Sequence, residues 1–529
     1  MSTATDAQVA ASRAGLASWI ERRPNLSVAI LYLLLIVVVR GPSFPITVID
    51  ADESAFWLAA REVVRGHLPY LTFFDIKPVG SSLLLAAALK LFGGGLFAIR
   101  LLGALCVWAT SLLLYRLGLA LAQGRGVAIT SGLLYVGFSA TMHGQATMTE
   151  ILLAPFTAAG VFLLVLAVRR PGLASGVGLM VISGLMFGMA VLIKLVPAAP
   201  AGAAVGVVLL HRWLARDLRL PTVIALGLAA VVGVATPFLL SAAVYVAAHQ
   251  WPAFYTSNFG FAGAYVRSSE SPARLLSALF RIAAGLWPLL LFAAIALIGG
   301  ALGAVRERRL SLSLMLLTAW LAGEVVASSA TLHFYPHYFL MTLPPLCVLC
   351  AQGVGRSVAW ATGAETSQRG AVGLALVLLL APVAPLLALQ GPTLFSHFDV
   401  WRSAASEIKK DAGGRKPTLF VLTQGLLALY PLTGADLPTP RAQPAQLLSD
   451  DQTMTDASNK AEYRRILATR PEFIVLDEVE DPPQWVLDGV RSAVACCYRR
   501  VATVRDFLNL DMAINRRHDV DIYQLAAPR

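Results

Sequence analysis

The chain has 529 residues and a formal net charge of +11, and 57% of its residues are hydrophobic while 14% are charged. Soluble domains carry about 25% charged residues, and a chain this poor in charge cannot cover a soluble surface. Intrinsic disorder is excluded as well, because it requires low hydrophobicity and high charge, whereas the mean hydropathy here is +0.68. The composition therefore predicts a polytopic α-helical membrane protein.

Eleven apolar runs approach the roughly 20 residues that a membrane-spanning helix needs. The predicted spans are 26–39, 98–115, 127–142, 151–168, 173–193, 195–210, 220–248, 282–302, 310–330, 339–355 and 371–389. Segments on one side of these spans carry at least two arginines each, and the short segments on the other side carry almost none. The positive-inside rule then places the N-terminus in the cytoplasm and the C-terminus outside. It also accounts for the positive charge without nucleic acid.

Two parts of the chain differ from the spans. The first outer loop, 41–97, is rich in charged and aromatic residues and contains a short apolar stretch, 81–92. This stretch fits a helix at the membrane interface or in the mouth of the bundle. Towards the C-terminus, short buried strands are predicted at 418–423, 473–476, 504–510 and 519–525, with a helix at 462–468. We therefore expect a transmembrane domain over 1–391 and a small extracytoplasmic α/β domain over 392–529.

Charged residues in the first outer loop are the strongest candidates for chemistry. Asp52-Glu53 follows the first span, and Asp75-Ile76-Lys77-Pro78 comes later in the loop. Each has a simpler reading: an acidic first helical turn for the former, and a turn with Pro opening the next helix for the latter. The spans are nearly free of charge. Charge gathered at the outer surface favours chemistry there over transport, which is expected to use ionisable residues at mid-span.

The order of the motifs resembles the GT-C glycosyltransferase family, and within it the protein O-mannosyltransferases and the lipid A aminoarabinose transferases. The matching residues are Asp52-Glu53, Ala60-Arg61-Glu62, Gly66, Pro69-Tyr70, Phe73–Gly80, Thr149-Glu150, Gly188–Lys194, Phe334–Phe339, Leu343-Pro344-Pro345 and Leu427–Gly434. Val79 stands where the family often has a second proline. The resemblance covers most of the chain in order, and its first-loop pattern is the most specific part.

The resemblance implies an inverting glycosyltransferase that moves a sugar from a polyprenyl-phosphate donor to a hydroxyl acceptor on the outer face of the membrane. The acid after the first span is catalytic in the family, and here it is Asp52. A carboxylate there can take the proton of the attacking hydroxyl. Neighbouring helical residues point about 100° apart, so Glu53 fits a helix cap or a cation ligand instead. Glu150 matches the second acid of the family, or is an ordinary N-terminal helix acid.

Binding of the donor phosphate requires cations, because negative charge develops on the leaving lipid phosphate. Lys77 is the strongest candidate. Lys194, His337, Tyr338 and Arg267 are further candidates. A snorkelling lysine is the simpler reading of Lys194, and an interfacial aromatic belt is the simpler reading of His337 and Tyr338.

The sequence does not require a cofactor. A divalent cation held by Asp52, Glu53 and Glu150 is left open, since no ligand spacing demands one. The expected partners are a polyprenyl-phosphate-linked sugar, a glycan, lipid or protein acceptor and membrane lipids, without nucleic acid. The expected location is a bacterial-type inner membrane. A lipid-linked-glycan flippase or transporter and a polysaccharide ligase are the alternative functions.

Overall fold

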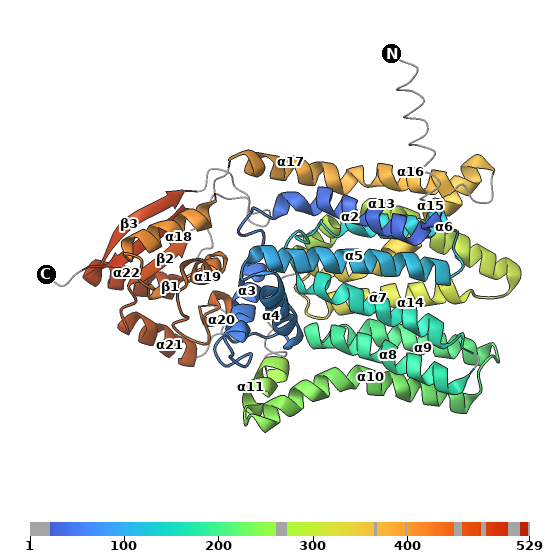
Figure 1. Ribbon diagram of the computed structural model, residues 1–529, viewed down its shortest axis with the longest axis horizontal. Coiled ribbons are helices and arrows are strands. Elements are labelled where there is room, and N and C mark those ends of the chain that lie inside the picture. Colours follow the sequence, from blue (N-terminus) through green and yellow to red (C-terminus); the bar gives the residue numbers. More distant parts are fainter. Residues whose placement is uncertain are drawn as a thin grey trace, which may run out of the picture.

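The computed structural model describes residues 22–170, 172–260, 272–363, 368–396, 399–448, 457–477, 483–505 and 519–526. Within these residues, a bundle of long helices is joined to a small C-terminal α/β domain, which lies at one end of the bundle (Figure 1). The predicted fold class, a polytopic helical membrane protein with a small α/β domain, is confirmed.

Nine helical segments of the described residues are long and apolar enough to cross a membrane. They contain α2 (Pro24–Arg40), α5 (Leu96–Ala120), α7 (Thr149–Ala167), α8 (Leu173–Ile193), α10 (Leu220–Ala247), α13 (Pro272–Glu307), α14 (Leu312–Ser329), η3 (Pro336–Thr342) with α15 (Leu343–Thr362), and α16 (Gln368–Leu378) with α17 (Leu380–Ser396). Two predicted spans correspond to shorter helices, α6 (Arg125–Phe138) with 14 residues and α9 (Ala198–Leu214) with 17 residues. Both lie alongside the long helices (Figure 1), so they belong to the bundle.

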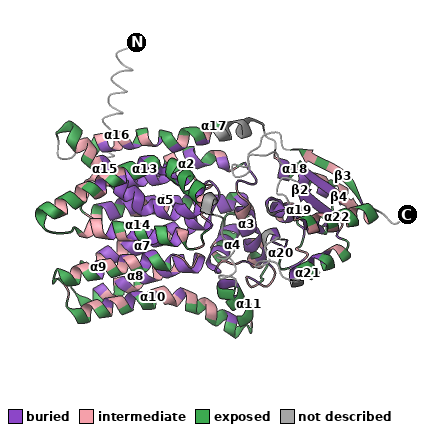
Figure 2. Ribbon diagram, turned by 180° about the vertical axis from the view of Figure 1, so that it is seen from behind, coloured by how far each residue is buried: buried purple, intermediate pink, exposed green. Residues whose placement is uncertain are grey.

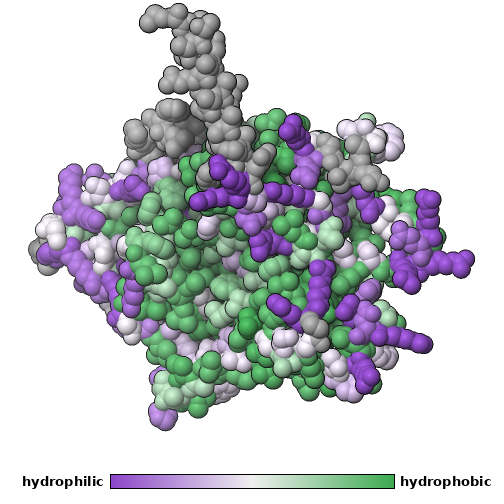
Figure 3. All heavy atoms as spheres, turned by 45° about the vertical axis from the view of Figure 1, so that its right-hand side comes forward, coloured by the Kyte–Doolittle hydropathy of each residue, from purple (hydrophilic) through white to green (hydrophobic). Residues whose placement is uncertain are grey.

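The lateral surface of the bundle, along the sides of its helices, is apolar. Buried residues fill its interior and exposed residues lie on its periphery (Figure 2). Large apolar side chains such as Leu34, Leu240 and Phe280 are 60%, 63% and 74% exposed. Figure 3 shows a broad hydrophobic surface with hydrophilic residues on either side of it. Soluble proteins rarely expose continuous apolar patches larger than a few hundred Å², so this surface is the one that meets lipid.

The first outer loop folds into two helices at the end of the bundle, α3 (Ala51–Val64) and α4 (Gly80–Phe92). The second of these confirms the short helix predicted at 81–92. α3 starts where it does because Asp50 caps it: the Asp50 carboxylate accepts a hydrogen bond of 2.9 Å from the backbone N–H of Asp52. α4 begins against the end of α8, where a Cβ at Gly80 would lie 2.5 Å from the carbonyl oxygen of Leu192. Glycine therefore allows this close approach.

The C-terminal domain is built on a four-stranded sheet in the order β1-β2-β4-β3. β1 and β2 pair in parallel, and β4 is antiparallel to both β2 and β3. Its strands are β1 (Leu419–Val421), β2 (Phe473–Asp477), β3 (Tyr498–Arg505) and β4 (Asp519–Leu525). Its helices are α18 (Val400–Asp411), η4 (Gln424–Ala428), α19 (Leu429–Thr433), α20 (Pro444–Leu447), α21 (Ala457–Ala468) and α22 (Gln484–Cys497).

Three of the four predicted strands are confirmed as β1, β2 and β4, and the predicted helix at 462–468 lies within α21. Of the strand predicted at 504–510, Val504 and Arg505 lie in β3, which begins earlier, at Tyr498; residues 506–510 lie outside the described part of the chain. β3 is an edge strand with mostly exposed or half-exposed residues. It therefore lacks the continuous apolar run that marks a buried strand.

Hydrogen bonds attach the C-terminal domain to the first outer loop. The Arg61 guanidinium donates to the carbonyl oxygen of Ala435 at 2.9 Å. The backbone N–H of Phe74 donates to the carbonyl oxygen of Pro440 at 2.7 Å. The last bundle helix, α17, continues to Ser396, beyond the domain boundary predicted at residue 391. The domain thus lies against the same end of the bundle as α3 and α4.

The orientation in the membrane is a prediction that labelling of two exposed serines can test. Ser175 is exposed in the first turn of α8, next to the segment with Arg169 and Arg170 that is predicted to be cytoplasmic, and Ser406 is exposed in α18. With Cys496 and Cys497 replaced by serine, the other three cysteines are buried. A membrane-impermeant thiol reagent added to spheroplasts should then label Ser406→Cys and not Ser175→Cys. Labelling of Ser175→Cys alone would reverse the topology.

Candidate functional site

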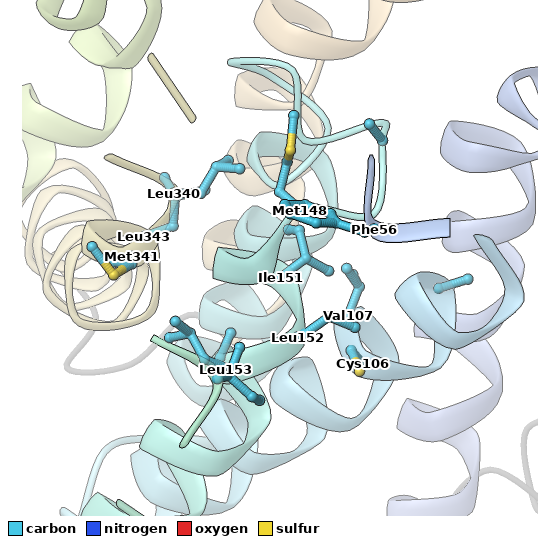
Figure 4. Close-up of a cluster of buried hydrophobic side chains, with 14 of the residues drawn as sticks. Phe56, Cys106, Val107, Met148, Ile151, Leu152, Leu153, Leu340, Met341 and Leu343 are labelled. Atoms are coloured by element: carbon cyan, nitrogen blue, oxygen red, sulfur yellow. The ribbon is translucent and has the colours of Figure 1, made fainter. Parts of the chain in front are cut away.

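Buried apolar side chains position the helix ends that carry the polar candidates. Buried side chains from α3, α5, α7, η3 and α15 pack together (Figure 4). They are Phe56, Cys106, Val107, Met148, Ile151, Leu152, Leu153, Leu340, Met341 and Leu343. This packing holds the start of α3, the start of α7 and η3 beside one another. Polar residues at these three places are consequently brought together, although they are far apart in the sequence.

Asp52, at the start of α3, lies in the middle of the polar residues. Its Oδ2 is 3.6 Å from Nζ of Lys77 and 4.0 Å from Nε2 of His337. Burial raises the pKa of Asp52, but Lys77, His337 and Lys194 together outweigh burial and hold the pKa below its ordinary value. The carboxylate is therefore ionised at neutral pH, and its side chain is still 23% exposed. It can therefore meet a substrate at the end of the bundle that carries α3 and α4.

The loop that carries Lys77 is fixed by its own hydrogen bonds. The Asp75 carboxylate accepts one of 3.2 Å from the backbone N–H of Lys77, and the Tyr70 hydroxyl donates one of 2.9 Å to the Lys77 carbonyl. Burial raises the pKa of Asp75, and Lys77 opposes that rise. Nζ of Lys77 stands 4.5 Å from the centre of the Phe56 ring. Asp75 thus shapes the turn, as its simpler reading predicts, while Lys77 faces Asp52.

A second acid–base pair lies beside the first. Nζ of Lys194, at the end of α8, is 2.5 Å from Oε1 of Glu150 and 3.7 Å from the centre of the Tyr338 ring. The Glu150 side chain is 1% exposed and that of Lys194 is 12% exposed. Lys194 therefore points into the site rather than snorkelling into water. The Tyr338 and His337 rings meet edge to face, with their centres 4.8 Å apart.

Glu53 points to a different neighbour from Asp52. Its Oε2 is 2.7 Å from Nη2 of Arg100, and both side chains are 1% exposed. Its Oε1 accepts a hydrogen bond of 2.8 Å from the backbone N–H of Thr147. Arg100 also donates to the carbonyl oxygens of Ser43, Ile46 and Thr47. Glu53 thereby ties α3 to α5 and to the segment before α7.

The remaining sequence candidates are placed differently. Arg267 lies outside the described residues. The three acids left open as cation ligands do not form a cluster, since Glu53 is paired with Arg100 and Glu150 with Lys194. Among the described residues, the group that could hold a metal ion is Asp50, His143 and His337. Sequence reasoning missed Asp50 and His143, and the one signal was a lone histidine in a short loop between apolar runs.

The chain is similar to a known protein family in part of its sequence and to solved structures over most of its fold. Residues 76–240 match the family described as dolichyl-phosphate-mannose-protein mannosyltransferase. No curated protein matches the chain. The structure of ArnT from Cupriavidus metallidurans in the apo state has a TM-score of 0.63 and 16% identity, over 97% of this chain and 100% of that one. ArnT bound to undecaprenyl phosphate has a TM-score of 0.61 and 16% identity, over 97% and 99%.

The apo oligosaccharyltransferase of Archaeoglobus fulgidus is also similar, with a TM-score of 0.53 and 14% identity over 87% of this chain and 70% of that one. At such identities the similarity establishes the fold. The chain therefore has the fold of the GT-C membrane glycosyltransferases, and the resemblance predicted from the sequence is confirmed.

Proposed function

We propose that the protein is a glycosyltransferase that moves a sugar from a polyprenyl-phosphate donor to a hydroxyl acceptor on the outer face of the membrane. The observation that carries this proposal is the Asp52 carboxylate, ionised, 23% exposed and 3.6 Å from Lys77 at the end of a membrane bundle. The shared fold supports it, because the ArnT structure that covers 97% of this chain contains undecaprenyl phosphate.

The reaction is a single displacement at the anomeric carbon of the sugar. Asp52 accepts the proton of the acceptor hydroxyl as its oxygen attacks that carbon. The bond between the anomeric carbon and the phosphate oxygen breaks, and the lipid phosphate leaves with the bonding electrons. Attack opposite the leaving group inverts the configuration of the sugar. The acceptor hydroxyl belongs to a glycan, a lipid or a protein.

The cations of the site are suited to the leaving phosphate. Lys77 is the nearest to Asp52 and can exchange its carboxylate partner for a phosphate oxygen. Lys194 is held by Glu150 and by the Tyr338 ring. We assign Glu150 and Tyr338 as positioning residues for Lys194, with His337 between the two acid–base pairs. Charge developing on the phosphate would be stabilised by groups already in place, without reorganisation during the reaction.

Lys77→Ala should weaken binding of undecaprenyl phosphate roughly ten- to hundredfold, because a charge-assisted contact contributes about 1.5–3 kcal/mol. Lys77→Arg should keep part of the affinity, since it keeps the charge. Lys90→Ala is the matched control, because Lys90 is exposed at the other end of α4. Titration of the purified variants with the lipid, followed by tryptophan fluorescence, measures the effect. Equal affinities in Lys77→Ala and wild type would remove Lys77 from the phosphate site.

A further inference from the structure

Beside Asp52, two histidines and one aspartate converge from three separate segments. Asp50 is the N-cap of α3, His143 lies in the loop between α6 and α7, and His337 lies in η3. Their ligand atoms are all within 4.8 Å of one another. The side chains are 13%, 19% and 11% exposed in the same order. The cluster is thus sheltered but open to solutes from the outer side.

We propose that Asp50, His143 and His337 form a binding site for a divalent ion of the zinc class. Zinc is bound by imidazole nitrogen and carboxylate oxygen at about 2.0–2.2 Å, in tetrahedral geometry. Ligand atoms around such an ion lie roughly 3.5 Å apart, so small rotations of these side chains bring all three into place. Two imidazoles favour zinc or cobalt over magnesium and calcium, which prefer oxygen ligands.

The backbone conformation around His143 indicates that its side chain is held in a defined position. Met142 and His143 both have left-handed backbone, with φ of 52° and 65°. Such conformations are unfavourable for non-glycine residues and persist where the surroundings hold them, often at functional sites. Nδ1 of His143 lies 2.7 Å from Oδ2 of Asp50, while Oδ1 of the same carboxylate caps α3. The cap therefore fixes the direction of the ligand oxygen.

A neighbouring aromatic ring fixes the orientation of the His337 ring. It stacks on Tyr335, with ring centres 5.8 Å apart and planes at 6°. Two ring positions are thus set before any ion binds, which lowers the entropy lost on coordination. A hydrogen bond between Asp50 and His143 alone would need neither this third ligand nor the strained loop.

The position of the ion deepens the proposed function. Three protein ligands leave at least one coordination position for water or a substrate oxygen. Nε2 of His337 is 4.0 Å from Oδ2 of Asp52, so the ion would be next to the carboxylate that we assign as the base. A positive ion there suits a phosphate oxygen of the donor. This role rests on the proposed function, whereas binding of the metal does not.

Metal content tests the site directly. The full-length protein, purified and desalted after incubation with Zn²⁺, should retain about one zinc per chain by mass spectrometry of the metal. With Co²⁺ instead, it should show visible d–d absorption of a low-symmetry nitrogen and oxygen site. His143→Ala and His337→Ala should each lower Zn²⁺ affinity roughly hundredfold or more, since even loss of an indirect partner costs 10- to 100-fold.

Two further variants separate loss of metal binding from loss of folding. Asp50→Asn keeps a side-chain acceptor for the α3 cap but removes the carboxylate charge, so it should weaken metal binding without unfolding the protein. His249→Asn is the matched control: His249 is exposed and has φ of 55°, which asparagine tolerates. It should bind Zn²⁺ like wild type. Thermal unfolding of each variant identifies any that fail to fold.

The proposal is overturned if wild type retains no Zn²⁺ and shows no Co²⁺ absorption, or if folded His143→Ala binds Zn²⁺ as tightly as wild type. A protein that binds zinc but transfers no sugar would uphold the site and overturn the proposed function. A protein that transfers sugar without binding zinc would uphold the proposed function and overturn the metal site.

Discussion

Asp52→Asn should fold, insert into the membrane and bind polyprenyl phosphate, yet transfer sugar about 10²–10⁴ times more slowly than wild type. Asparagine keeps the size of the side chain but has no negative charge and cannot take the proton of the acceptor. Lys77 also loses the carboxylate that lies 3.6 Å away. Undecaprenyl phosphate should therefore bind to Asp52→Asn at least as tightly as to wild type. Lower turnover with undiminished lipid affinity separates a base from a phosphate ligand.

Asp488→Asn is the matched control for this change. Asp488 lies in α22, its side chain is 62% exposed, and its partner Arg491 is on the surface as well. Sugar transfer and lipid affinity should both stay at wild-type values in this variant. If purified Asp52→Asn turned over as fast as wild type, Asp52 would not be the base, and Glu150 would be the next acid to test.

Glu53→Gln should lower the free energy of unfolding by about 3–5 kcal/mol, the cost of leaving one partner of a buried ion pair uncompensated. The guanidinium of Arg100, 1% exposed, would lose its carboxylate. Glu53→Met combined with Arg100→Met should recover part of the loss, because replacing a whole buried pair by apolar groups is often neutral. Recovery stays partial because the carbonyl oxygens of Ser43, Ile46 and Thr47 lose their donor. Thermal unfolding in detergent, monitored by tryptophan fluorescence, measures both.

Glu472→Gln controls for removal of a carboxylate from an ion pair. Glu472 pairs with Arg415, whose side chain is 70% exposed, and exposed pairs contribute about 0–1 kcal/mol. Its unfolding should therefore match wild type closely. A Glu53→Gln variant that is fully stable but inactive would show that Glu53 acts in the chemistry and does not brace α3.

The membrane architecture was predictable because lipid imposes a simple requirement on the chain. Every backbone group in the hydrocarbon core must bond internally, so spans are helices with a characteristic apolar length. That requirement identifies α8 to the residue, since the predicted run and the helix are both Leu173–Ile193. It is less informative for α6, whose 14 residues are mostly buried against α2, α5, α15 and α16. Helices inside a bundle need not be long or uniformly apolar.

The candidate site was predictable only in part. The motif order singled out Asp52 and Lys77 in one loop, and the structure places them 3.6 Å apart. The contact of Lys194 with Glu150 joins residues 44 positions apart. Resemblance to a family pointed to both residues, but no local pattern pairs them.

Other site contacts could not be paired from the sequence. Asp50 and His143 are 93 positions apart, and only packing of the loop before α7 against α3 brings them together. The same holds for Glu53 and Arg100, 47 positions apart. Arg100 is a charged residue near the start of the predicted span 98–115. Its partner could not be chosen from the several acids of the first outer loop.

Mass spectrometry of envelope glycans and lipids in a deletion strain tests most directly whether the protein, through Asp52, transfers a sugar from a polyprenyl phosphate. We expect one sugar to disappear from an envelope glycan, lipid or protein while a polyprenyl-phosphate-linked sugar accumulates. Wild-type protein should restore the sugar, and Asp52→Asn, produced at the same level, should not. Unchanged glycans and lipids in the deletion strain would contradict the proposed sugar transfer, and full restoration by Asp52→Asn would contradict the role of Asp52 as the base.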